Sequence, residues 1–171
     1  MNGNPEQFVI RMIEALPGVN CIRIPFNKNS FNTDGTLDPM FERFLVAAAS
    51  HNLQLIPVLA DGDAQSFMGT SAEISAKLEG ETFDGIVEGW TLMKEWMGRH
   101  PNVESAVYGW ELLNEPASYK RAVSEATPQE RAEMQEQMVQ LYVNHMAELS
   151  SIVSTGSDAH ILVSAWGYGA D

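Results

Sequence analysis

The 171-residue chain lacks the features that mark several classes of protein. Cys21 is its single cysteine, which excludes an internal disulfide and leaves the redox compartment undecided. We expect this thiol to be a buried structural group within an apolar strand. No apolar run approaches the roughly 20 residues that cross a bilayer, so no membrane partner is expected. The four histidines show no metal-ligand spacing, and the sequence predicts neither a metal nor another cofactor.

Positively charged residues are also few, since the chain has 10 Lys and Arg residues and 23 Asp and Glu residues. The formal net charge of −13 would repel a phosphate backbone, so nucleic acid is not an expected partner, whereas a neutral substrate is compatible. A hydrophobic fraction of 44% and a charged fraction of 19% are typical of a globular domain. The first residues, 1–5, carry no secretory signal. The chain is expected either to stay inside the cell or to have lost such a signal.

Helix and strand patterns alternate along the chain. Asn4-Pro5 and Asp38-Pro39 each combine a capping side chain with proline at the first helical position, and Thr127 to Glu130 has the spacing of a capping box. Segment 61–82 and the residues after Pro116 are predicted to be loops. The expected strands are four apolar runs, at 19–26, 53–59, 107–114 and 160–166. Pro57 lies inside the second run, where we expect a bulge or loosened pairing.

These patterns predict a single α/β domain over residues 1–171, with four parallel strands that are each preceded by a helix. Because the strand runs are continuously apolar, both faces of the sheet are expected to be buried. The central run ends in Asn114-Glu115-Pro116. Proline is expected to hold Glu115 extended and to stop the strand. An amide and a carboxylate then lie at the carboxyl end of a buried strand, where parallel barrels build active sites. These two residues could equally be ordinary turn residues.

Three segments resemble clan A glycoside hydrolases, and most closely the family 5 endoglucanases and β-mannanases. Residues 19–26 are similar to the second strand of that barrel, 110–116 (Trp-Glu-Leu-Leu-Asn-Glu-Pro) to the fourth, and 160–163 to the fifth. The resemblance implies half of a (β/α)8 TIM barrel that acts on β-linked polysaccharide. It implies that Glu115 is the general acid/base and that Asn114 binds the sugar 2-hydroxyl.

The resemblance also assigns roles to further residues. Arg23 would hold the nucleophilic carboxylate, although a structural ion pair at a barrel mouth is an equal alternative for an arginine within a strand. Trp166 and Tyr168 would stack on sugar rings. Trp110 is expected to pack in the core, Glu111 to lie deeper in the barrel wall, and His145 to be a hydrogen-bonded histidine on a helix face.

The family barrel has eight strands in about 250 residues, and neither its first strand nor its nucleophile on the seventh strand has a counterpart here. Four parallel strands alone would leave two open edges. We therefore expect a homodimer of half-barrels that completes the eight strands, with the two Glu115 residues on opposite walls of one cavity. The alternative function is a catalytically inactive half-barrel that binds carbohydrate or serves as an assembly module.

Overall fold

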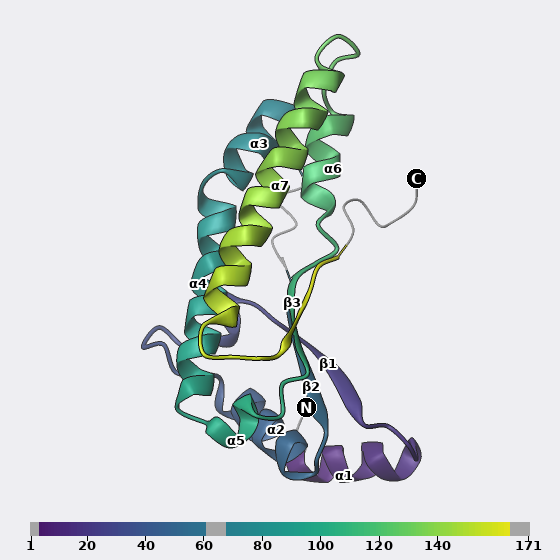
Figure 1. Cartoon of the computed structure of the whole chain (residues 1–171), viewed down its shortest axis with the longest axis vertical. Coiled ribbons are helices and arrows are strands. Elements are labelled where there is room, and N and C mark those ends of the chain that lie inside the picture. Colours follow the sequence, from purple (N-terminus) through teal and green to yellow (C-terminus); the bar gives the residue numbers. More distant parts are fainter. Residues whose placement is uncertain (1–3, 61–67, 165–171) are drawn as a thin grey trace.

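The computed structural model describes residues 4–60 and 68–164. It is an α/β fold with one four-stranded sheet in the order β1-β2-β3-β4, in which all neighbours are parallel (Figure 1). The strands are β1 (Cys21–Phe26), β2 (Gln54–Ala60), β3 (Gly109–Asn114) and β4 (His160–Leu162). The predicted strands and their parallel arrangement are thus confirmed, although β4 is shorter than expected within the described residues.

The helices fill the connections between the strands. They are α1 (Pro5–Ala15), the short 3-10 helix η1 (Lys28–Ser30), α2 (Pro39–Ser50), α3 (Ser71–Leu78), α4 (Glu81–Gly98), α5 (Pro101–Glu104), α6 (Ala117–Ser124) and α7 (Arg131–Ser154). Asn4 and Asp38 cap α1 and α2 through their side chains, as predicted. None of the helices in the described residues is both long and apolar enough to cross a membrane.

Three helix predictions were wrong. The expected loop 61–82 contains α3, which begins with a capping box between Thr70 and Glu73. The expected loop after Pro116 contains α6. Helix α7 begins at Arg131 rather than at the predicted Thr127 capping box, and the Thr127 hydroxyl donates to the Glu130 side chain at 2.6 Å. Gly156, at φ 67°, follows the last turn of α7 in the left-handed conformation that commonly ends helices.

One face of the sheet carries the hydrophobic core. Trp90 of α4 donates its indole N–H to the Leu112 carbonyl oxygen at 2.9 Å, and its ring packs edge-on against Phe26 and Trp110. Gly89 allows this close approach, because a Cβ there would lie 3.0 Å from the Leu59 side chain. In Figure 1, α4 and α7 run side by side along this side of the strands. Trp110 is fully buried, and its predicted packing role is confirmed.

The opposite face is open. Arg23 and Pro25 are exposed where their neighbours Ile24 and Phe26 are buried, and Gln54 and His160 are exposed on the adjoining strands. Alternate residues of a strand point to opposite faces, so these exposed residues share the face away from the helices. Helices cover only one face within a single copy, and the other face holds the buried Val58 beside the exposed Arg23 and Pro25, so one copy alone does not bury both faces as expected. The fold is consistent with half of a barrel whose inner face lacks its other half.

Candidate active site at the carboxyl end of the third strand

A β-bulge in β3 creates the candidate site. Val58 pairs with Glu111 and Ala60 pairs with Asn114, so two steps along β2 correspond to three along β3. The extra residue in β3 places Glu111 and Asn114 on the same face, although residues three apart in a regular strand point to opposite faces. Pro57 lies beside this irregularity and has no amide hydrogen, so it cannot donate a hydrogen bond to a neighbouring strand. The irregular pairing predicted near Pro57 is thus present.

Arg23 links these two side chains from β1. Its Nε donates to Glu111 Oε2 at 2.6 Å, and its Nη2 donates to Glu111 Oε1 at 2.6 Å and to Asn114 Oδ1 at 2.7 Å. Ser164, just past β4, donates its hydroxyl to Glu111 Oε1 at 3.1 Å. The cluster therefore links β1, β3 and the segment just past β4, and it engages both oxygens of the Glu111 carboxylate. The fork of Arg23 on Glu111 is the bidentate geometry that fixes orientation best.

The electrostatics of the cluster keep Glu111 ionised. The hydrogen bonds from Arg23 hold the pKa of Glu111 below its ordinary value, against the opposing effect of burial, and the Ser164 hydroxyl adds to the lowering. Arg23 in turn has a raised pKa, first through its bonds to Glu111 and then through the charges of Glu111 and Glu115. Glu115 is therefore close enough to contribute to the field at the guanidinium group.

Glu115 itself lies at the exposed carboxyl end of β3, one residue beyond the cluster. Its φ of 45° is in the left-handed region, so the prediction of an extended backbone was wrong. Proline at the next position disfavours the right-handed helical region, and the chain turns at once into α6, with Ala117 N–H donating to the Glu115 carbonyl at 2.5 Å. A left-handed non-glycine residue costs about 1–2 kcal/mol, and such strain is concentrated at functional sites.

The sequence-predicted site residues are only partly brought together. Arg23, Asn114 and Glu115 meet at one end of the sheet, and Arg23 holds Glu111 as its carboxylate. Trp166 and Tyr168 lie outside the described residues. Sequence reasoning did not find Ser164, and it set Glu111 aside as part of the barrel wall. The signal for Glu111 was its acidic side chain within an otherwise apolar strand, which needs a cationic partner of the kind that Arg23 provides.

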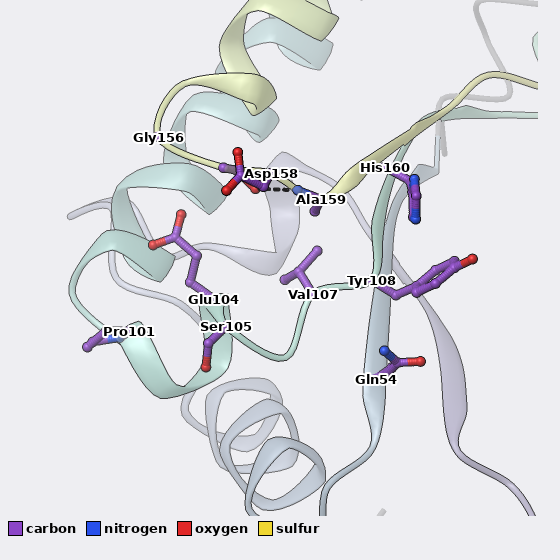
Figure 2. A pocket seen from close by; sticks show the side chains of 11 residues that line it. Gln54, Pro101, Glu104, Ser105, Val107, Tyr108, Gly156, Asp158, Ala159 and His160 are labelled. Carbon is purple, nitrogen blue, oxygen red and sulfur yellow. Dashed lines mark hydrogen bonds between the residues drawn. The ribbon is translucent and has the colours of Figure 1, made fainter.

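Among the cavities lined by described residues, two flank the sheet, and Asn114 and Glu115 line neither of these two. The first, of about 600 Å³, lies at the amino ends of β3 and β4, opposite the cluster. Figure 2 shows Tyr108 and His160 together beside the strands of this cavity, and their ring centroids are 4.9 Å apart. In parallel barrels this end serves stability rather than chemistry. The second cavity, of about 1010 Å³, is an apolar groove along β1.

No protein family model matches the chain, and no curated protein matches its sequence. The described residues also contain no group of three or more His, Cys, Asp or Glu side chains that could hold a metal ion. The chemistry of the cluster and the resemblance of the strand motif are therefore what point to a function.

Proposed function

We propose that the carboxyl edge of the sheet is one half of a carbohydrate-hydrolysing site that acts on β-linked polysaccharide such as β-glucan or β-mannan. The observation that supports this function is the cluster of Arg23, Glu111 and Asn114 directly before the exposed, strained Glu115. Hydrolysis of a glycosidic bond needs a carboxylic acid that protonates the departing oxygen and a second carboxylate near the anomeric carbon. Glu115 is the proposed general acid/base.

Asn114 is the proposed sugar ligand. Its Oδ1 accepts a hydrogen bond from Arg23 at 2.7 Å, which fixes the amide orientation and leaves Nδ2 as the donor group. This donor can bind a sugar hydroxyl beside Glu115. Glu111 then acts as a positioning residue, since it holds the guanidinium group that orients Asn114.

The second carboxylate is proposed to come from a second copy of the chain. Within one copy, both oxygens of Glu111 are engaged by Arg23 and Ser164, so this carboxylate is not free to attack or to activate water. A homodimer that closes eight strands would set the two Glu115 residues on opposite walls of one cavity. A separation of about 6.5–9.5 Å would leave room for a water molecule and give inversion, whereas about 5–5.5 Å would give retention.

Turnover of β-mannan and carboxymethylcellulose, measured as reducing ends released, tests this function. General acid/base catalysis contributes about 10²- to 10⁴-fold, so Glu115→Gln should lower the rate by at least about a hundredfold. Glu95→Gln, at an exposed position on α4, is the matched control and should retain full activity. Equal rates for the two variants, or no turnover by the unmodified chain, would contradict the proposed catalysis.

The engagement of both Glu111 oxygens favours one alternative, an inactive half-barrel that binds carbohydrate or serves as an assembly module. Calorimetric titration with cello- and manno-oligosaccharides separates the two functions. Binding without turnover, weakened by Asn114→Ala but not by Glu95→Gln, would select the binding module.

A further inference from the structure

The outer edge of β1 has backbone groups available for another strand. Gln54 N–H donates to the Asn20 carbonyl oxygen at 2.8 Å, and Cys21 is the residue paired with Gln54. In a parallel ladder this pattern directs the N–H and C=O of Cys21 and Arg23 away from β2. Pro25 follows on the same side but has no N–H, so a strand paired with β1 could bond the backbone groups of Cys21 and Arg23, and the pairing would end or bulge at Pro25.

The outer edge of β4 offers the complementary groups. His160 N–H donates to the Tyr108 carbonyl oxygen at 3.1 Å, and His160 pairs with Gly109. The backbone groups of Ile161 and Val163 are therefore directed away from β3. Because all four strands are parallel, β4 of another molecule can pair with β1 in the same sense as every existing pair.

An apolar groove accompanies the β1 edge. Phe8, Met12 and Leu16 line it at helical spacing on α1, and Phe8 and Leu16 are 53% and 57% exposed. Met40 of α2, also exposed, extends the lining. On α7, the helix that precedes β4 in the chain, Val139 and Val143 stand four residues apart and are 44% and 52% exposed. The β1 edge and the helix before β4 thus both carry exposed apolar side chains that a second molecule could cover.

The charge distribution opposes contact between these two edges less than it opposes contact between two copies of the acidic part of the chain. Residues 1–50 contain four Arg and Lys residues and five Asp and Glu residues, so their net charge is −1. Residues 51–171 contain six Arg and Lys residues and eighteen Asp and Glu residues, so their net charge is −12. The groove lining includes one cation, Arg23, and one anion, Asp38. The acidic α7, with Glu133, Glu136 and Glu148 against Arg131, would meet the least acidic part of the surface.

The strand register of one copy can be continued across the proposed seam. Pro25 lies opposite Val58, Val58 opposite Glu111, and Glu111 opposite Leu162. An eight-stranded barrel of this type has a shear of about eight residues, or about four for each half. Four residues before Pro25 is Cys21, the first residue of β1. Leu162 of a second copy would therefore lie opposite Cys21, with both side chains on the inner face.

We propose that β1 and its groove receive β4 and α7 of a second copy of this chain, and that a two-fold axis repeats the contact to close an eight-stranded barrel. Two-fold symmetry requires the same pair of surfaces at both seams. This dimer is the one on which the proposed function rests, here specified through its edges and its register. The dimer does not require the sugar chemistry, so loss of turnover with an intact dimer would remove only the proposed function, whereas a folded monomer would remove both.

Oxidative crosslinking tests the register, because Cys21 is the chain's single cysteine. Burial raises the pKa of the Cys21 thiol, so a copper-phenanthroline oxidant is needed. Leu162→Cys should give a disulfide-linked dimer with Cys21 of the second copy. Within one copy the two positions are three strand spacings apart, about 14 Å, which is too far for a disulfide. Val163→Cys, on the other face, is the matched control and should not crosslink.

Light scattering of the full chain measures the assembly, and we expect twice the 18.9 kDa mass of one copy. Phe8→Glu should raise the dimer dissociation constant at least tenfold, with a far-ultraviolet circular dichroism spectrum like that of the unmodified chain. A folded monomer would overturn the proposal. A dimer that crosslinks through Val163→Cys and not through Leu162→Cys would overturn the proposed docking.

Discussion

His145 provides a quantitative test of the structure, because its ionisation opposes folding. The side chain is 6% exposed, between three helices. Its ring stacks on Phe83 of α4 with centroids 3.4 Å apart and planes 8° from parallel, and its Nδ1 lies 2.6 Å from the hydroxyl of Tyr119 on α6. The sequence-based expectation of a hydrogen-bonded histidine is confirmed. A proton added here would place a charge against an aromatic ring in a buried setting.

The size of the loss in stability follows from the difference between the pKa of His145 in the folded chain and in the unfolded chain. Burial lowers the pKa of His145 from 6.5 to about 4, while the charge of Glu79 opposes the lowering. The unfolded chain therefore binds a proton at a higher pH than the folded chain does. The stability that the folded chain gains by keeping His145 neutral is fully present above pH 6.5 and is lost as the pH falls toward 4. One pH unit corresponds to about 1.4 kcal/mol, so the loss from this one histidine approaches about 3 kcal/mol.

Urea unfolding at pH 7 and at pH 4.5, followed by circular dichroism, measures this loss. His145→Gln keeps a polar group near Tyr119 without titrating, so its stability should fall by about 2 kcal/mol less than that of the unmodified chain between these pH values. His51→Gln, at the end of α2, should keep the full decrease. Carboxylates titrate alike in all three proteins and cancel in the comparison. Equal decreases for the unmodified chain and His145→Gln would refute the reasoning.

Two further predictions concern the sheet. Arg23→Met should destabilise the protein by about 1–2 kcal/mol at pH 7, because Glu111 loses its charged partner. Since that partner lowers the pKa of Glu111, the deficit should shrink as the pH falls below 4.5, and a deficit independent of pH would contradict the ion pair. Gly109→Ala should cost about 1–3 kcal/mol in thermal unfolding, because the new Cβ would lie 3.1 Å from the His160 carbonyl oxygen. Gly98→Ala, with no atom within 4 Å of its Cβ, should be neutral or stabilising, and an equal loss in both variants would contradict the crowding.

Local signals predicted the parts of the fold that depend on neighbouring residues. Asn4-Pro5 and Asp38-Pro39 start helices because their side chains and proline rings act within one turn. The apolar runs predicted four strands, and the helices between them required parallel pairing. Helix α3 could have been predicted as well, since Thr70 and Glu73 have the spacing of a capping box.

The sequence by itself thus determined the four strands, the starts of α1 and α2, and that Asn114 and Glu115 follow a buried strand. Only the tertiary structure decided which residues join them. The bulge of β3 against β2 turned Glu111 to the face of Asn114, and the neighbouring strands brought Arg23 and Ser164 to the same carboxylate. Register across a sheet is a property of paired strands, and one strand's pattern of side chains does not contain it. The contact between Arg23 and Glu111 spans 88 positions of the chain, a distance over which no local signal acts.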